Sequence, residues 1–121
     1  MRLRATLALA VALRLVLTAI PASALSASPT EILTSPDRYD GQAVTIRGTV
    51  TNLRETVSRR GNPYYTFDLS DGTRAIKVFS FGKAPCKIGQ AATVDGTFEK
   101  VKRQGRYTFY NEVEAASVSC R

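Results

Sequence analysis

Residues 64–81 decide the fold, and they read YYTFDLSDGTRAIKVFSF. Apolar and polar residues alternate from Tyr64 to Leu69 and again from Arg74 to Phe81, which is typical of strands with one buried face. Between them, Asp71-Gly72 supplies the positive φ values that a tight hairpin turn requires. The stretch therefore predicts an antiparallel hairpin. Its inward-facing residues are Tyr65, Phe67, Leu69, Ile76 and Val78.

The same alternation predicts three further strands. They cover residues 44–51, 92–98 and 106–118, the last one after a turn at Gln104-Gly105. Five strands in a small chain leave exposed edges unless the sheet closes on itself. The five-stranded, partly open Greek-key barrel known as the OB-fold closes such a sheet. Gly48 and Gly96 lie in mid-strand, where a long strand has to bend sharply to serve both halves of a barrel.

The segments between the strands have their own signals. Ser28 suits the cap of a short helix, Pro29 its first position and Glu31 its first turn, and Pro36 is expected to end it. The polar stretch 54–63 is expected to be a loop because Gly61-Asn62-Pro63 is a turn signal. Residues 83–90 are expected to form an irregular connector.

Residues 1–24 have the order of an export signal. Two arginines precede an apolar run from Ala5 to Ile20, and Ala22-Ser23-Ala24 offers small residues to a signal peptidase. A retained membrane anchor is the alternative, but the run is shorter than the ~20 residues needed to span a bilayer and contains Arg14. We expect cleavage near Ala24, one domain over residues 25–121, no remaining membrane span, and a periplasmic or secreted location.

The net charge restricts the partners only weakly. The whole chain has a formal charge of +7, but three of its arginines belong to the expected signal. The remaining 97 residues hold 14 basic and 10 acidic side chains, a net charge of +4. Such a charge permits binding to polyanions and is also ordinary for a soluble domain.

Both cysteines, Cys86 and Cys120, lie in the expected mature part. An even number in an exported chain favours a disulfide. Two free thiols or a metal pair are the alternatives, although a metal site would be short of ligands because the chain has no histidine. In the OB topology the third and fifth strands pair in parallel, so their carboxyl ends share one rim. A disulfide between the two cysteines would lock that closure.

Over residues 30–120 the chain resembles bacterial OB-fold proteins of the tRNA-anticodon-binding type. The segments that carry the resemblance are Ile32-Leu33, Pro36, Tyr39-Asp40-Gly41, residues 44–50, residues 65–73 and residues 76–79. These are core and turn positions, so the resemblance implies the fold and leaves the ligand open. Many members of that superfamily bind single-stranded nucleic acid, and others are exported bacterial proteins. The haem chaperone of cytochrome c maturation is similar in barrel and export, but it holds haem through a histidine, so we expect no cofactor.

OB-folds bind ligands on the face of strands two and three, between the loops that join strands one to two and four to five. In this sequence both loops are basic, and the strands between them carry aromatic residues. Bases stack on aromatic faces while arginine and lysine follow the phosphates. The predicted binding residues are Arg54, Arg59 and Arg60 in the first loop, Lys100, Lys102, Arg103 and Arg106 in the second, and Tyr64, Thr66, Lys77 and Phe79 on the strands between.

Other interpretations of these residues stay open. Basic residues in surface loops are most often simply solvated, and Phe79 could pack beneath the helix or the connector. Tyr107 or Tyr110 could extend an aromatic platform, but alternation fails near the end of the last strand, so the sequence does not say which of them faces outward.

Catalysis is not expected, since general acid–base chemistry without histidine would fall to carboxylates, lysine or tyrosine. Asp68 and Asp71 are explained as turn formers, and Glu112 and Glu114 as a surface pair. The sequence predicts a non-catalytic, monomeric module that binds single-stranded nucleic acid or a similar polyanion. The alternative is an exported envelope protein that uses the barrel to bind a protein or a small ligand.

Overall fold

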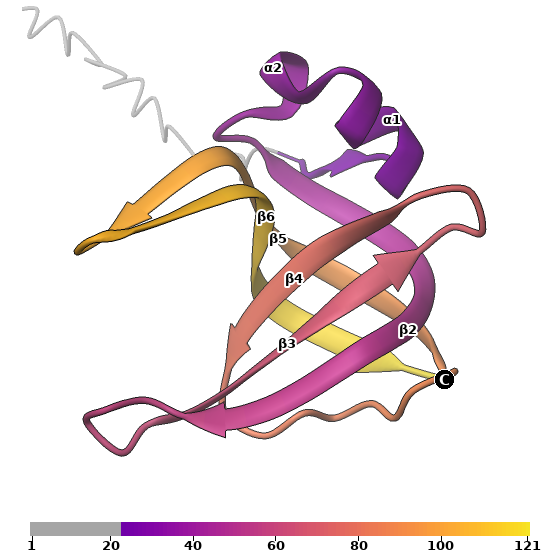
Figure 1. Ribbon diagram of the computed structural model, residues 1–121. Coiled ribbons are helices and arrows are strands. Elements are labelled where there is room, and N and C mark those ends of the chain that lie inside the picture. The colour runs from indigo at the N-terminus through magenta and orange to yellow at the C-terminus, as the bar shows by residue number, and fades with distance from the viewer. Residues whose placement is uncertain (1–22) are drawn as a thin grey trace, which may run out of the picture.

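The computed structural model describes residues 23–121, so nearly all of the expected signal, 1–24, lies outside the described residues (Figure 1). Within this part of the chain, no helix combines the length and the apolar character that crossing a membrane requires. The elements are β1 (Leu25–Ser26), α1 (Pro29–Thr34), α2 (Pro36–Tyr39), β2 (Ala43–Val57), β3 (Pro63–Ser70), β4 (Ala75–Phe81), β5 (Ala91–Gln104) and β6 (Tyr107–Cys120).

The strands form one sheet in the order β1-β2-β3-β4-β6-β5, and pairing of β2 with β5 closes it into a ring. The five long strands are the five expected from the sequence, and their order is that of an OB barrel. As expected, β4 and β6 pair in parallel, from Lys77 opposite Glu112 to Phe79 opposite Glu114. The two-residue β1 is a sixth strand that the alternation did not predict, and it pairs in parallel with the start of β2.

The expected helix is confirmed, and a second one follows it. The Ser28 hydroxyl accepts a hydrogen bond from the backbone N–H of Glu31 at 3.0 Å, and the Glu31 carboxylate accepts one from the N–H of Ser28 at 3.2 Å. This reciprocal capping box starts α1. Pro36 comes after the end of α1 and also begins the short α2, because proline is well suited to a first helical turn.

Two strands are longer than the sequence predicted. β2 continues to Val57 and β5 to Gln104, so the connecting segments shrink to residues 58–62 and to a turn at Gly105-Arg106. The continuation of β2 is antiparallel to β3, with Arg54 opposite Thr66, after a bulge at Asn52 where φ is +48°. Both faces of these extensions are largely exposed, so they lack the alternation that marks a half-buried strand.

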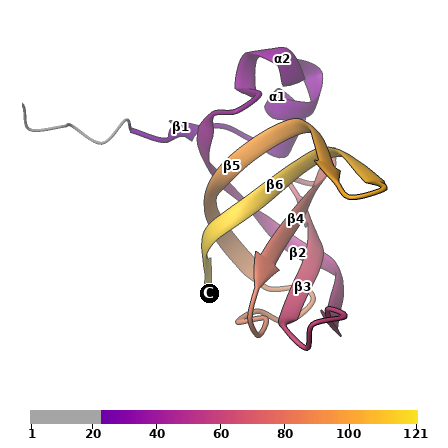
Figure 2. The same ribbon diagram turned by 90° about the vertical axis from the view of Figure 1, so that its left-hand side faces the viewer.

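These extensions project from the barrel as two hairpins. We call residues 52–66 the β2–β3 arm and residues 100–111 the β5–β6 arm. Figure 1 shows both arms leaving the same side of the barrel, and Figure 2 shows β5 and β6 running side by side to the tip of theirs. The β3–β4 hairpin and the carboxyl end of β6 lie on the opposite side.

The barrel interior is filled by apolar side chains from every long strand and from α1. The largest fully buried ones are Phe67, Phe98, Ile32, Ile46, Leu69 and Ile76. Gly48 and Gly96 mark where strands approach most closely. A Cβ on Gly48 would lie 2.5 Å from the carbonyl oxygen of Ser70, and one on Gly96 would collide with the carbonyl oxygen of Glu114. Both mid-strand glycines are therefore required by the curvature of the barrel.

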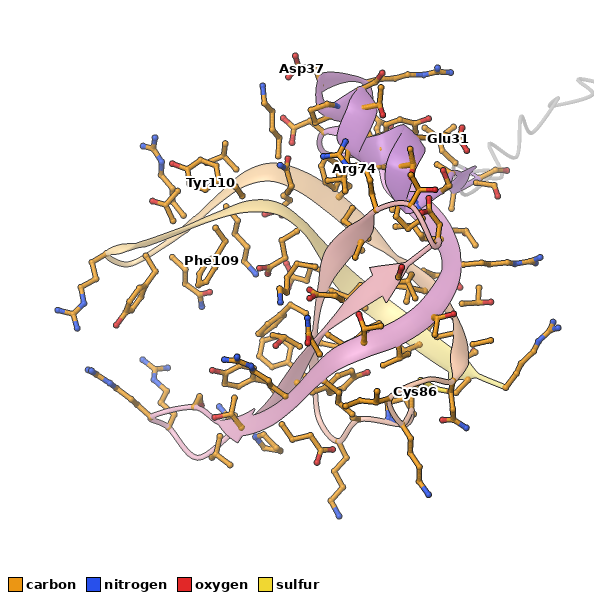
Figure 3. All side chains as sticks on the ribbon, turned by 45° about the vertical axis from the view of Figure 1, so that its right-hand side comes forward. Glu31, Asp37, Arg74, Cys86, Phe109 and Tyr110 are labelled. Atoms are coloured by element: carbon orange, nitrogen blue, oxygen red, sulfur yellow. A yellow bond between two sulfur atoms is a disulfide. The ribbon has the colours of Figure 1, made fainter. Side chains whose placement is uncertain are left out.

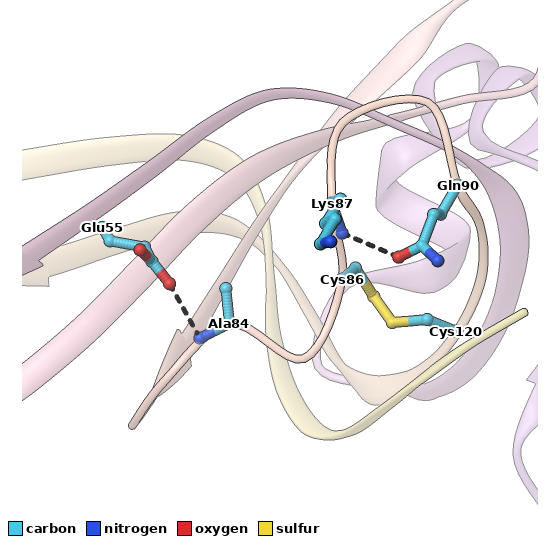
Figure 4. The surroundings of a disulfide bond; sticks show 6 residues. All are labelled: Glu55, Ala84, Cys86, Lys87, Gln90 and Cys120. Carbon is cyan, nitrogen blue, oxygen red and sulfur yellow. Dashed lines mark hydrogen bonds between the residues drawn. A yellow bond between two sulfur atoms is a disulfide. The ribbon is translucent and has the colours of Figure 1, made fainter.

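Cys86 and Cys120 lie at disulfide distance, with Cα atoms 5.6 Å apart (Figure 4). The connector that carries Cys86 is held along β2, since Gly89 N–H donates to the carbonyl of Val50 at 2.8 Å. The N–H of Ala84 also donates to the Glu55 carboxylate at 3.3 Å. The pair thus ties the segment after β4 to the end of β6, at the rim where the sequence placed it.

Replacing Gly96 by alanine tests the curvature. The added methyl group has to displace backbone of β6, and overpacking of this kind costs ~1–3 kcal/mol. We expect the free energy of unfolding, measured with urea on the mature chain, to fall by about that amount. Ser119→Ala, at an exposed position on the neighbouring strand, is the control and should change it by less than ~0.5 kcal/mol. Equal stability of both variants would contradict the close-approach explanation.

Candidate functional site

Three aromatic rings share the outer face of β3 and β4. Tyr64 pairs with Phe81 across the two strands, and the ring of Phe79 lies 5.3 Å from that of Tyr64 and 5.0 Å from that of Phe81. Phe81 is 66% exposed. Phe79 therefore lies at the centre of an exposed cluster and is not packed beneath the helix or the connector. We call Tyr64, Phe79 and Phe81 the aromatic floor.

Thr66, opposite Phe79 on β3, belongs to the same face, as predicted. Arg54 is opposite Thr66 on β2 and continues this row. Its place on a strand corrects the expectation that it lies in a loop. A small cavity of about 240 Å³ borders Tyr64 and is walled by the end of β2 and by Gly82-Lys83.

One side of the β5–β6 arm faces the aromatic floor. Lys102 pairs with Phe109 across this arm, and the Lys102 amine lies 4.7 Å from the centre of the Phe79 ring. Tyr107 stands two residues before Phe109, with the ring centres 6.5 Å apart. Figure 3 shows Phe109 on the side of the arm toward the β2–β3 arm and Tyr110 on the far side. Tyr107 and Phe109 thus join the site, and Tyr110 does not.

The sequence could not settle these orientations, because Asn111 has a φ of +52° and interrupts the alternation of β6. Lys102 is also a strand residue, not a loop residue as predicted, because β5 reaches Gln104. The predicted member Phe109 was missed for the same reason. Its pairing with Lys102 in an extended hairpin would have been the only signal for it.

Lys102 is held by two carboxylates on β6. Its amine lies 3.5 Å from Glu112 and 3.7 Å from Glu114. Glu112 is only 6% exposed, so its interpretation as a surface residue is wrong. β6 runs between β4 and β5, and Lys102 covers its outer face. Burial raises the pKa of Glu112 above its ordinary value, while Lys102 opposes and Glu114 adds to that rise.

Lys77 is likewise neutralised on the floor. Its amine lies 2.8 Å from Asp68, which also accepts a hydrogen bond from the Asn52 side chain at 2.8 Å. Burial acts to raise the pKa of Asp68, but these two partners outweigh it and hold the pKa below its usual value. Asp68 therefore links three strands and is not a turn former. Asp71 is one, because it accepts from the N–H groups after it in the hairpin.

Lys100 does not join the predicted site. Its amine lies 2.6 Å from the carboxylate of Asp37 on α2, and its backbone N–H donates to Asp40 at 2.9 Å. The hydrogen bond from Lys100 to Asp37 raises the pKa of this lysine. Like Lys102 and Arg103, Lys100 is on strand β5 and not in a loop. It fastens the base of the arm to α2.

The predicted arginines have a different environment from the lysines. Within residues 23–121, no carboxylate lies within 4 Å of the guanidinium groups of Arg54, Arg59, Arg60, Arg103 and Arg106. Arg59 and Arg60 occupy the tip of the β2–β3 arm, in a tight loop closed by the N–H of Ser58 and the carbonyl of Asn62 at 2.8 Å. Arg106 occupies the tip of the other arm, where its guanidinium lies 5.4 Å from the Tyr107 ring centre. Charge free to meet a ligand is therefore concentrated at the tips.

Two solved structures have a similar fold. A protein described as an aspartyl-tRNA synthetase from Leishmania major Friedlin matches 81% of this chain with a TM-score of 0.60 and 15% identity, and the chain spans about a fifth (21%) of that protein. The second OB-fold domain of replication protein A from Methanococcus maripaludis matches 67% of this chain and 85% of its own, with a TM-score of 0.46 and 19% identity. No protein-family model and no curated protein matches the sequence. At these identities the likeness extends to the fold alone.

Replacing Lys102 by methionine tests the buried ion pair. The substitution leaves Glu112 beside Glu114 without its cation, and an unpaired buried charge costs ~1–3 kcal/mol. We expect the free energy of unfolding at pH 7 to fall by that amount. A carboxyl group whose pKa is raised by folding binds its proton more tightly in the folded state, so the loss should shrink as the pH falls through the raised pKa toward 4.5.

The measurement is urea unfolding of wild type and variant at pH 7 and pH 5. Comparing them at each pH cancels the contribution of Asp68, which both share. Lys87→Met, at an exposed lysine of the connector, is the control and should be neutral at both values. A loss that is independent of pH would show that Lys102 stabilises the arm by packing and not through Glu112.

Proposed function

We propose that the mature chain is a non-catalytic, monomeric module that binds single-stranded nucleic acid across the aromatic floor. The observation that carries the proposal is the arrangement of exposed aromatic rings between two arms whose tips carry arginines without carboxylate partners. Aromatic faces accept any base by stacking, and arginines follow the phosphates. OB barrels bind ligands on this face, between these two connections.

The distribution of charge favours one orientation of the strand. On the floor, Lys77 and Lys102 are already paired with Asp68, Glu112 and Glu114, so that surface attracts phosphates little. The arginines at the tips have no such partners. We infer that the bases turn inward onto Tyr64, Phe79 and Phe81 while the sugar–phosphate backbone passes along the tips.

We also propose that the chain acts outside the cytoplasm, after removal of residues 1–24. Cleavage after Ala24 would leave Leu25 and Ser26 available to pair with Val44 and Thr45 as β1. The mature chain would then keep every element that positions the site. An oxidising compartment also suits the pairing of Cys86 with Cys120.

Salt-dependent binding tests the role of the arginines. We expect the mature chain to bind a labelled single-stranded oligonucleotide with an affinity that falls steeply as salt rises, because bound cations are released. Arg59→Ala with Arg60→Ala should weaken binding and reduce the slope of log K against log salt by roughly 1.4, the value for two lost contacts to a single strand. Fluorescence anisotropy at several salt concentrations measures both quantities.

The matched control is Arg47→Ala with Arg74→Ala, which removes the same charge from exposed positions near the opposite side of the barrel. It should leave the slope unchanged. Equal effects of both double variants would mean that net charge, and not the arm tip, attracts the strand. No binding at low salt would reject the proposal and favour an envelope module for a protein or small ligand.

Two equally exposed aromatic residues test the floor itself. Phe81 is 66% exposed on the floor, and Tyr110 is 68% exposed on the far side of the β5–β6 arm. Loss of one stacked base costs ~1–3 kcal/mol, or about 5- to 150-fold in affinity. We expect Phe81→Ala to show this loss and Tyr110→Ala to bind like wild type. The reverse order, measured by the same anisotropy titration, would place the bound strand on the outer side of the arm.

A further inference from the structure

A second, larger cavity lies on the side of the barrel away from the two arms. Its volume is about 550 Å³, and it is bordered by the bend of β2 at Gly48, the Ser70–Gly72 hairpin, the start of β5 and Arg121. Figure 1 shows the hairpin and the end of the chain opposite the arms. Small-molecule sites in proteins typically have volumes of ~300–1,000 Å³. The cavity is therefore large enough for a ligand and separate from the aromatic floor.

The lining of this cavity combines two guanidinium groups with three hydroxyl groups. Arg47 and Arg121 supply the charge, and in the described chain no carboxylate lies within 4 Å of either guanidinium. The hydroxyl groups belong to Thr49, Ser70 and Thr93. Strand pairing holds them together, since Arg47 is opposite Thr93 and Thr49 is opposite Ser70.

The one carboxylate in the lining, that of Asp71, is engaged elsewhere. Its Oδ1 accepts hydrogen bonds from the N–H groups of Thr73 and Arg74, both at 2.9 Å. Its Oδ2 accepts from the N–H of Thr30 on α1 at 3.0 Å. Both oxygens are thus directed to the hairpin and the helix, and neither neutralises Arg47 or Arg121.

The backbone around the cavity is fixed in place. The N–H of Arg121 donates to the carbonyl of Ala91 at 2.9 Å, and the preceding Cys120 is tied to Cys86. On the other wall, Gly48 allows β2 to touch the carbonyl of Ser70, where any side chain would clash. Ser70 and Arg121 therefore present their side chains from anchored positions, which lowers the entropy lost on binding.

We propose that this cavity is a second binding site, for a phosphorylated small polar molecule. A guanidinium group matches the oxygens of a phosphate with two parallel hydrogen bonds, and two guanidinium groups can hold one phosphate from both sides. The hydroxyl groups of Thr49, Ser70 and Thr93 can donate to the phosphate or bind the hydroxyl groups of a sugar. Because a phosphate fills only part of the cavity, the ligand carries a polar body as well.

The test is a titration of the ¹⁵N-labelled mature chain with ribose 5-phosphate, followed by amide chemical shifts at constant ionic strength. We expect saturable shifts at Gly72, Ala92 and Thr93, and none at Tyr64 or Phe79. Ribose should produce no shifts, and inorganic phosphate should produce weaker ones at the same amides. Shifts that fail to saturate, or that sodium chloride reproduces, would overturn the proposal.

Variants separate this site from the aromatic floor. Arg47→Gln should weaken ribose 5-phosphate binding at least tenfold, and Arg121→Gln provides a second test at an exposed terminal position where loss of folding is not expected. Arg59→Ala with Arg60→Ala should leave these shifts unchanged. Unchanged binding by both Arg47→Gln and Arg121→Gln would overturn the proposal, whatever the outcome of the oligonucleotide titration.

Discussion

The parallel pairing of β4 with β6 is the constraint on which the other features depend. It spans only three residue pairs, centred on Val78 and Val113, and both of these valines are fully buried. The pairing closes the barrel and brings β6, with its acidic residues, beside the aromatic residues of β4. It also carries the β5–β6 arm over the floor and brings Cys120 to the rim next to Cys86. A disulfide there reinforces a closure that few backbone hydrogen bonds make.

The second organising feature is the separation of paired and unpaired cations. Lysines near the barrel are each held by a carboxylate on another element: Lys77 by Asp68, Lys100 by Asp37, and Lys102 by Glu112 and Glu114. These ion pairs fasten strands and the base of an arm to their neighbours. Arginines at the tips have no such role, so their charge stays available. The overall charge of the domain conceals this difference, because it counts both groups alike.

Local patterns predicted the barrel well and the arms poorly. Alternation in 64–81, the Asp-Gly turn and the mid-strand glycines were sufficient for the five strands and their order, because each depends on burial of one face or on a turn. The same rule failed for Arg54 and Lys102, which were expected in loops. Their strands continue beyond the core, where no buried face remains to produce alternation. Asn111, with its positive φ, likewise hid the orientation of Phe109.

By itself, the sequence determined the barrel, its capping helix, the pairing of Cys86 with Cys120 and the general place of a basic, aromatic face. These follow from the period of apolar residues and from the backbone needs of glycine and proline, which act over a few neighbouring positions. Only the tertiary structure decided which cations are free, which aromatic residues form the floor, and that Arg47 and Arg121 border one cavity. Those properties depend on side chains far apart in the chain, such as Lys102 over Phe79, and no local pattern encodes such contacts.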